Sequence, residues 1–387
     1  MGDPLTIFIL AGDTSGERQG AALAQALTAR APGLRLQGIG GERMRQAGVE
    51  MVMDSSAWSA IGVGDSLRRA PTLLRRGRQI ARRLRAAPPD LVVLIDFGTF
   101  NVRFAGMLAG SGIPILYYFP PRSWSRRRWG GPLNQVTDVI ATPFAWNLDT
   151  MSGGKAEVVW VGHPLVDQVR PTLAPTAVAA KHGLDLARPI LALIPGSRVS
   201  EVRGMFPAMV TAAGRLVAEF PGLQLMVPVA PGIDRLRLER RLTAAGLQAV
   251  LLEGTDYDAL QLATVAAATS GTVTLELALL GVPAVVLYRV SCPSMLQFHL
   301  ARLLYGPIPF IAMPNIIAEE RVYPEFLQSH VNGVQISQEV GRLLRSPDER
   351  ARVRQQLAVV RQGLGPGGAS NKTAELALAL ARRPTAR

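Results

Sequence analysis

The sequence contains a single cysteine, Cys292, among 387 residues. One cysteine excludes an intrachain disulfide framework and a cysteine-based metal cluster, and it is compatible with a reducing cytoplasm. The four histidines show no HExxH motif or other ligand spacing, so we expect no structural or catalytic metal. The N-terminus has no basic region followed by a cleavage site, and we expect no signal peptide.

Lysine is also scarce, since only Lys155, Lys181 and Lys372 occur, yet the formal net charge is +13. Almost all of the positive charge therefore comes from arginine. Nucleic acid, an anionic membrane surface or phosphorylated substrates would suit this balance, and an arginine-rich coding bias would also produce it. The sequence has no zinc-finger, RNP or basic-zipper pattern, so we expect no nucleic-acid partner.

A long uninterrupted apolar run is missing as well. The longest weakly charged stretch covers residues 260–288, a length that would suit a membrane span. The residues that interrupt it are Ser270, Gly271, Thr272, Thr274, Glu276 and Pro283. The stretch therefore favours a globular strand–turn–helix–strand unit over a membrane span.

The sequence does contain a regular alternation of short apolar runs with helical segments. The expected buried strands are 6–10, 36–39, 91–95, 113–119, 136–141, 158–161, 190–194, 224–228, 249–252, 265–268 and 284–288. The expected helices are 20–30, 66–87, 102–109, 201–219, 234–245 and 272–280, with two more after residue 338. This alternation predicts an α/β fold whose parallel sheets carry helices on both faces.

The alternation stops and restarts once, which predicts two Rossmann-like, doubly wound domains. We expect an N-terminal domain over 1–168 and a C-terminal domain over 180–350, with a linker in the Pro-, Ala- and Thr-rich stretch 170–180. Helices over 355–387 are expected to pack back on the N-terminal domain. Doubly wound sheets bind ligands at the carboxyl ends of their strands, so we expect the site in the crevice there.

Small residues follow the first two expected strands. They are Gly12, Ser15 and Gly16 in AGDTSGE at 11–17, and then Gly40 and Gly41. Glycine lets the backbone turn sharply and approach a ligand, and the following helix offers free N–H groups. A tight turn that needs glycine for its geometry explains the loops equally well. Their order and spacing differ from the GxGxxG dinucleotide fingerprint.

Two loops of phosphate-binding type follow expected strands of the second half. The first supplies Gly196, Ser197 and Arg198, and the second supplies Ser270, Gly271 and Thr272. Glycine admits a close approach of the backbone, hydroxyl groups bind phosphate at a helix start, and arginine offers a fixed fork of donors. Each loop alone also occurs as an ordinary helix cap.

Glu276 is the only charged residue of the stretch 260–288. A buried carboxylate is costly unless it is paired or bound to a ligand. Glu276 is therefore either an acceptor for a ribose diol or an ordinary helical glutamate. His163, in GHP at 162–164, is similarly either a bonded structural residue or a base.

Arginine and aromatic residues gather in two segments of the first half. The segment YYFPPRSWSRRRW occupies 117–129, and the expected helix 66–87 precedes it. The arginines of that helix are Arg68, Arg69, Arg75, Arg76, Arg78, Arg82, Arg83 and Arg85. Together the two segments favour contact with an anionic surface, with a solvated basic face as the alternative.

All of these motifs occur in one order along the chain. They are AGDTSGE at 11–17, GIGGERM at 38–44, IGVGD at 61–65, IDFGTFN at 95–101, VGHPL at 161–165, PGSRVSE at 195–201, SGTVTLE at 270–276, YR at 288–289, PNIIA at 314–318 and PEFLQ at 324–328. In this order they resemble the lipid-A-disaccharide synthase family over residues 5–330. The resemblance implies GT-B architecture, in which two Rossmann-like domains face a central crevice.

The resemblance also implies a reaction. The family transfers a diacylglucosamine unit from a UDP-sugar donor to a diacylglucosamine 1-phosphate acceptor, with inversion, loss of UDP and no metal. The UDP-sugar is a substrate, and no cofactor is expected. Because both substrates carry acyl chains, the family implies a cytoplasmic protein attached peripherally to the anionic inner face of the cell membrane. A homodimer and a monomer both remain open.

Residue roles follow from the same resemblance. Arg198 and helix dipoles would stabilise the UDP leaving group, and the loops of the second half would hold the donor, with its ribose on Glu276. The remaining positions expected to bind substrate are Asn101, His163, Glu201, Arg289 and Asn315.

The departures from the family pattern lie on the acceptor side. Thr99 stands where the family has an aspartate, and threonine cannot act as a base at neutral pH. The family's histidine is absent from 116–125, and Asp13 and Glu17 reverse the usual order of glutamate and aspartate. We therefore expect the base to be Asp96 or Asp13. The open alternatives are a changed acceptor, a related reaction such as epimerisation, or binding of a nucleotide-sugar without turnover.

Overall fold

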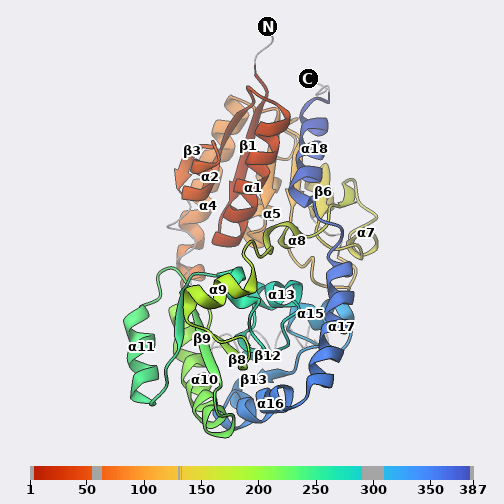
Figure 1. Cartoon of the computed structure of the whole chain (residues 1–387). Helices are drawn as coiled ribbons and strands as arrows, with labels where there is room; N and C mark the ends of the chain where they lie inside the picture. The colour runs from red at the N-terminus through yellow and green to blue at the C-terminus, as the bar shows by residue number, and fades with distance from the viewer. Residues whose placement is uncertain (1–3, 55–62, 130, 132, 290–308, 384–387) are drawn as a thin grey trace. The chain divides into compact units, whose positions relative to one another are not determined.

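The computed structural model describes residues 4–54, 63–129, 131, 133–289 and 309–383. The chain divides into unit 1, formed by Met1–Pro164 and Leu364–Arg387, and unit 2, formed by Leu165–Gly363 (Figure 1). Cys292 and the first two residues of the IGVGD motif lie outside the described residues, as do the side chains of Thr99, Arg68 and Arg69.

Unit 1 is built on seven parallel strands in the order β3-β2-β1-β4-β5-β6-β7. The strands are β1 (Thr6–Ala11), β2 (Arg35–Gly40), β3 (Glu50–Asp54), β4 (Leu91–Ile95), β5 (Ile115–Tyr118), β6 (Val139–Thr142) and β7 (Glu157–Trp160). Strand order reverses between β1 and β4. Ligands of doubly wound sheets bind at such a switch point, outside the carboxyl ends of the strands.

Helices cover both faces of this sheet. They are α1 (Thr14–Arg30), α2 (Glu42–Gln46), α4 (Val63–Ala86), α5 (Gly98–Leu108), α6 (Leu133–Val136), α7 (Asn147–Thr150) and α18 (Ala369–Ala381). Ile7 and Ile9 of β1 pack in one core with α1 and α18, whereas Phe8 and Leu10 pack in the opposite core with α4 and α5. This burial on both faces is the reason that β1 reads as a continuous apolar run.

Unit 2 contains six parallel strands in the order β10-β9-β8-β11-β12-β13. The strands are β8 (Ile190–Ile194), β9 (Gln224–Val229), β10 (Val250–Glu253), β11 (Val265–Thr269), β12 (Ala284–Tyr288) and β13 (Glu325–Leu327). The switch point lies between β8 and β11. Both units are therefore doubly wound parallel sheets, and the predicted fold class is confirmed.

The helices of unit 2 differ in part from the sequence prediction. They are α8 (Leu165–Gln168), α9 (Pro175–His182), α10 (Val199–Glu219), α11 (Arg235–Ala244), α12 (Tyr257–Leu260), α13 (Thr272–Leu279), α15 (Met313–Ala318), α16 (Gly333–Arg345) and α17 (Pro347–Gly363), with the short 3-10 helix η1 (Gln328–His330). The tail thus forms three helices, α16 to α18, where two were expected. The chain returns to unit 1 at Leu364, so the part of the tail between 355 and 363 belongs to unit 2.

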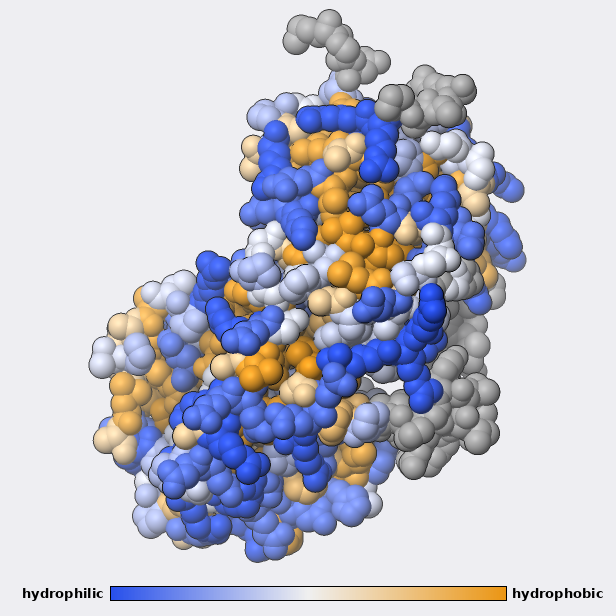
Figure 2. Space-filling model, turned by 90° about the vertical axis from the view of Figure 1, so that its right-hand side faces the viewer, coloured by the Kyte–Doolittle hydropathy of each residue, from blue (hydrophilic) through white to orange (hydrophobic). Residues whose placement is uncertain are grey.

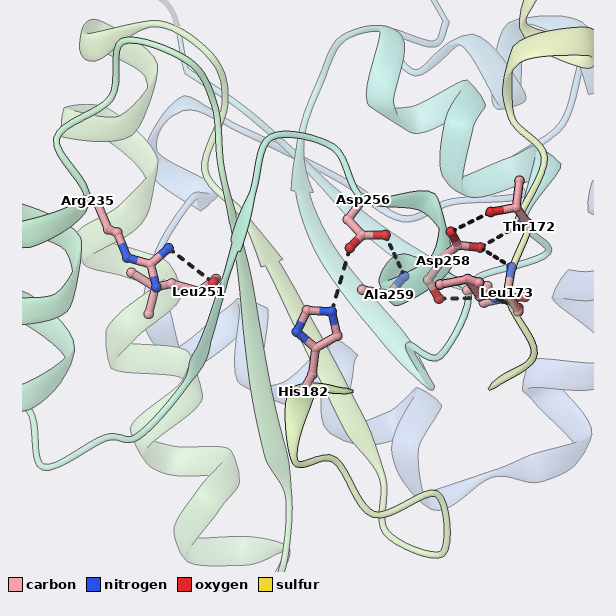
Figure 3. Close-up of polar contacts among 9 residues, drawn as sticks. Thr172, Leu173, His182, Arg235, Leu251, Asp256, Asp258 and Ala259 are labelled. Atoms are coloured by element: carbon pink, nitrogen blue, oxygen red, sulfur yellow. Dashed lines mark hydrogen bonds and ion pairs between the residues drawn. The ribbon is translucent and has the colours of Figure 1, made fainter. Parts of the chain in front are cut away.

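The stretch 170–180, expected to be a linker, belongs to unit 2 and includes the start of α9. Asp258 holds the segment before this helix, because its carboxylate accepts hydrogen bonds from the backbone N–H groups of Thr172 (2.5 Å) and Leu173 (2.9 Å) (Figure 3). These bonds lower the pKa of Asp258. The end of α9 lies near α12, where His182 Nε2 is 3.7 Å from Asp256 Oδ2.

Residues 260–288 fold mainly as β11, α13 and β12, in agreement with the sequence prediction. Among the described helices, none is both long enough and apolar enough to cross a membrane. Figure 2 shows one face of the molecule, on which hydrophilic residues surround patches of hydrophobic ones. Strands β3 and β13 were not predicted, because each is short, lies at an edge of its sheet and begins with a charged residue.

A glycine between β1 and β2 provides a test of this packing. A Cβ built on Gly38 would lie 2.1 Å from the carbonyl oxygen of Ile9, a backbone atom that cannot rotate away. We expect Gly38→Ala to lower the free energy of unfolding by about 1–3 kcal/mol, the usual cost of overpacking, in urea denaturation. The control is Gly106→Ala in α5, where a Cβ meets no described atom within 4 Å. An unchanged unfolding midpoint for Gly38→Ala would contradict the described approach of the two strands.

Candidate functional site

At the switch point of unit 1, the structure brings together Asp13, Ser15 and Asp96. Asp13 is the N-cap of α1, and its Oδ1 accepts a hydrogen bond from the N–H of Gly16 at 2.7 Å. Ser15 Oγ lies 3.1 Å from Asp13 Oδ1 and 3.2 Å from Asp96 Oδ2. A hydroxyl group has one proton, so Ser15 donates to one of the two carboxylates at a time. Both candidate bases therefore belong to one cluster.

The backbone turns sharply where Asp96 follows β4. Asp96 and Phe97 have φ values of 48° and 47°, a left-handed conformation that costs non-glycine residues energy. Asn101 Nδ2 donates to the carbonyl oxygens of Ile95 (3.1 Å) and Asp96 (2.9 Å), and the hydroxyl of Tyr117 donates to the latter at 2.7 Å. These bonds stabilise the turn and aim Asp96 at Ser15.

Two residues expected to bind substrate thus have structural roles at this turn. Asn101 is fully buried and holds the backbone of β4 and Asp96. Gly12 makes room for Phe97, because a Cβ at Gly12 would lie 2.3 Å from the aromatic ring. Binding of a ligand by either residue stays a prediction.

The electrostatic environment of Asp96 favours a base. Burial, and after it the negative charge of Asp13, raise the pKa of Asp96 to about 6, although hydrogen bonds from Ser15 and from the backbone of Phe97 act in the opposite direction. A carboxylate with such a pKa is mostly ionised at neutral pH and binds a proton more strongly than an ordinary aspartate. Burial also raises the pKa of Tyr117 well above its usual value, so its hydroxyl stays a donor.

The loop after β2 is explained by packing. A Cβ on Gly40 would lie 2.3 Å from Met44 Sδ, and one on Gly41 would lie 2.6 Å from Glu17 Oε1. Glu17 itself accepts a hydrogen bond from the N–H of Arg43 at 2.7 Å, near the start of α2. The described contacts therefore support the alternative of loop geometry for Gly40 and Gly41.

His163 is buried against two aromatic rings. Its ring centroid lies 5.3 Å from that of Phe119 and 5.7 Å from that of Phe144. Burial, and then the positive charge of Arg18, lower the pKa of His163 to about 3. The imidazole is therefore neutral at physiological pH, which favours the structural interpretation of this residue.

The glycine–serine–arginine turn of unit 2 follows β8 directly. Glu201 Oε2 accepts hydrogen bonds from the backbone N–H groups of Ser197 (3.0 Å) and Arg198 (3.2 Å). The guanidinium of Arg198 donates to Glu201 Oε1 at 2.7 Å, although 77% of the Arg198 side chain is exposed. Glu201, expected to bind substrate, thus occupies the N–H groups that a phosphate would use, while Arg198 remains accessible.

The second loop begins where β11 ends, beside β8. A Cβ built on Gly271 meets no described atom within 4 Å, so the backbone there is open to a ligand. Thr272 begins α13, and the hydroxyl of Thr274 donates to the carbonyl oxygen of Gly271 at 2.8 Å. Because β8 and β11 are neighbours, the loops with Arg198 and Gly271 lie at the same edge of the sheet.

Glu276 is buried in α13, with 4% of its surface exposed. Its Oε1 accepts a hydrogen bond from the hydroxyl of Tyr257 at 3.1 Å. Tyr257 begins α12, and nothing in the sequence near it pointed to this contact. The Tyr257 hydroxyl thus gives the buried carboxylate a neutral hydrogen-bond donor from the first residue of α12.

Arg289 and Asn315 are occupied by contacts within unit 2. The guanidinium of Arg289 donates to the carbonyl oxygens of Gly204 (2.9 Å) and Val331 (2.8 Å). Asn315 is fully buried, donates to the carbonyl oxygen of Tyr323 and accepts from its N–H, both at 2.8 Å. Both residues hold loops in place, and a contact of either one with substrate stays a prediction.

Solved structures share the arrangement of two parallel-sheet units. A putative UDP-N-acetylglucosamine 2-epimerase from Listeria monocytogenes is 15% identical, with a TM-score of 0.67 and coverage of 100% of this chain and 98% of its own. The glycosyltransferase of kitacinnamycin is 15% identical, with a TM-score of 0.62 and coverage of 98% and 100%. The fold is that of GT-B glycosyltransferases and related epimerases.

Sequence relatives give the family. A model of the family described as lipid-A-disaccharide synthetase matches residues 7–378. The lipid-A-disaccharide synthase of Geobacter sulfurreducens is 35% identical over 373 residues, covering 96% of each chain, and that of Myxococcus xanthus is 36% identical over 385 residues, covering 98% of each. The chain belongs to the lipid-A-disaccharide synthase family, and the predicted resemblance is confirmed.

The raised pKa of Asp96 predicts a dependence of stability on pH. A carboxyl group whose pKa is higher in the folded protein stabilises the fold below its unfolded pKa, and this contribution is lost as pH rises through about 6. We expect Asp96→Asn to raise the free energy of unfolding at neutral pH by roughly 1–3 kcal/mol and to leave it nearly unchanged at pH near 4. Urea denaturation at several pH values measures this difference.

Asp13→Asn is the matched control for that experiment. Asparagine is also a good N-cap, so α1 should remain capped, while the loss of charge should lower the pKa of Asp96. If the free energy of unfolding of Asp96→Asn equals that of the parent protein at every pH, the pKa of Asp96 is not raised in the folded protein.

Proposed function

We propose that this protein transfers a diacylglucosamine unit from a UDP donor to diacylglucosamine 1-phosphate, with inversion, and releases UDP. The observation that carries the proposal is the joint position of Arg198 and the Ser270–Thr272 loop at the switch point of unit 2, in a chain of this family. Exposed arginine and the N-terminus of a helix are donors that suit a diphosphate. Glu276 would accept hydrogen bonds from the ribose.

In the proposed reaction, Asp96 takes the proton of the acceptor's 6-hydroxyl group. The freed electron pair forms a bond to the anomeric carbon of the donor sugar, and the bond from that carbon to the UDP oxygen breaks. UDP leaves with the electron pair, and its developing charge is stabilised by Arg198 and the N-terminus of α13. Attack on the face opposite UDP inverts the anomeric carbon.

Peripheral attachment to the inner face of the cell membrane, on the cytoplasmic side, belongs to the same proposal. The arginines at 75, 76, 78, 82, 83 and 85 are exposed on α4, opposite the face that carries Ile80 and Leu84 into the core. In the segment 117–129, the guanidinium of Arg126 lies 4.2 Å from the ring centroid of Trp146. Exposed arginine beside aromatic rings suits the interface of an anionic bilayer.

The donor site can be tested without turnover. We expect Glu276→Ala to weaken UDP binding by about 1–3 kcal/mol, the scale of a lost charge-assisted hydrogen bond, in isothermal titration calorimetry. Tyr257→Phe removes only the hydroxyl that contacts Glu276 and should weaken binding less. Glu239→Ala, at an exposed position of α11, is the charge-matched control. Equal UDP affinity in Glu276→Ala and the control would contradict the assignment of Glu276 to the ribose.

The base is tested by transfer. We expect Asp96→Asn to keep its UDP affinity while transfer falls by roughly 10²–10⁴-fold, and kcat/KM of the parent to rise with pH through about 6. Product analysis by mass spectrometry with a UDP-diacylglucosamine donor provides the measurement. Transfer that survives Asp96→Asn but disappears in Asp13→Asn would exchange the two roles.

The departure at Thr99 leaves one further outcome of the same assay. If the parent protein binds UDP but forms no disaccharide with any acyl-glucosamine acceptor, the proposed reaction is wrong for this chain. Release of UDP with another acceptor would then point to a different transfer. Interconversion of the UDP-sugar itself would point to the epimerase chemistry named for the Listeria structure.

A further inference from the structure

A basic, apolar-floored groove lies between α10 and α11 in unit 2. Its floor is formed by Val202, Phe206 and Leu238, and its margin carries Arg203, Arg237 and Arg241. The groove has a volume of about 170 Å³. It shares no lining residue with the proposed donor site.

The three arginines of this groove are uncompensated. Among the described residues, none accepts a hydrogen bond from the guanidinium groups of Arg203, Arg237 or Arg241, and none forms an ion pair with them. Asp234 also lines the groove, but its carboxylate caps α11 through the N–H of Arg237 at 3.2 Å. Like charges gathered around an apolar floor repel one another, so the groove favours an anionic occupant.

The apolar lining of the groove also reaches the surface. Val199, which lines the groove, is 49% exposed. A free phosphate would use the guanidinium groups and leave this apolar surface in water. An occupant with an acyl chain attached to a phosphate would use both.

We propose that this groove binds an anionic phospholipid of the membrane surface. An acyl chain lies against Phe206 and Leu238, and the phosphate of the headgroup is held by Arg203, Arg237 and Arg241. Unit 2 then has a lipid contact of its own, separate from the arginines of α4. This inference holds whichever sugar transfer the protein carries out.

The test uses the full chain with vesicles of phosphatidylcholine that either contain or lack phosphatidylglycerol. We expect the double variant Arg237→Ser/Arg241→Ser to lower the partition coefficient for the anionic vesicles about 25-fold, since one arginine near an anionic bilayer contributes roughly fivefold. The matched control is Arg240→Ser/Arg352→Ser, which removes two charges from exposed helix positions outside the groove. Equal losses in the two double variants, or no loss in the first, would overturn the proposal.

A second measurement locates the lipid. A phosphatidylglycerol with a photoreactive group on its acyl chain should label the peptides that contain Val199–Phe206 and Arg237–Leu242 after irradiation, and the groove variant should lose this label. Labelling confined to other peptides would exclude the groove. Displacement of the protein from vesicles by inorganic phosphate at equal concentration would show an anion site in place of a lipid site.

Measurements of UDP binding test the lipid groove separately from the proposed donor site. UDP affinity in calorimetry should be unchanged in the groove variant, and Glu276→Ala should bind anionic vesicles as the parent does. Loss of UDP affinity in the groove variant would show that the arginines belong to the donor site, which contradicts a separate lipid site.

Discussion

Burial of parallel strands on both faces is the constraint on which the chemistry of this protein depends. A strand such as β4 packs apolar side chains above and below the sheet and has no room for a polar group along its length. Polar residues are therefore confined to the strand ends. In both units the strand order reverses at the centre of the sheet, and each reversal places two loops with polar residues side by side.

The two switch points carry different sets of charged side chains. In unit 1, Asp13 and Asp96 share the hydroxyl of Ser15, and burial with mutual repulsion makes Asp96 a stronger base than a free aspartate. In unit 2, Glu201 neutralises the start of α10 and leaves Arg198 exposed. The described switch points thus differ in charge: that of unit 1 holds two carboxylates, whereas that of unit 2 holds an exposed arginine beside a carboxylate.

The sequence was informative wherever a residue's neighbours in the chain decide its structure. Strands β8 and β12 match their predicted bounds because each is an apolar run between clear breaks. The loops after β8 and β11 were located from the glycine and hydroxyl residues that follow those strands. The motifs did not reveal the contacts that their residues make within the protein. Arg289, Asn315 and Glu201 bond to groups of the protein itself, and Asn101 supports a strained turn that no local pattern announces. Tyr257 reaches Glu276 across 19 positions of sequence, a distance over which periodicity carries no information.

The position of α18 in the chain affects the order in which the two units can fold during synthesis. Ala374, Ala377 and Leu378 belong to the same core as Ile7 and Ile9, so unit 1 is completed by a helix that is translated after the whole of unit 2. Unit 2, by contrast, is one continuous segment. On the ribosome, unit 2 can finish folding first, while the core that α1 shares with α18 stays incomplete until α18 has been translated. A premature stop codon within α18 would therefore leave the core of unit 1 incomplete, although unit 2 would be translated in full.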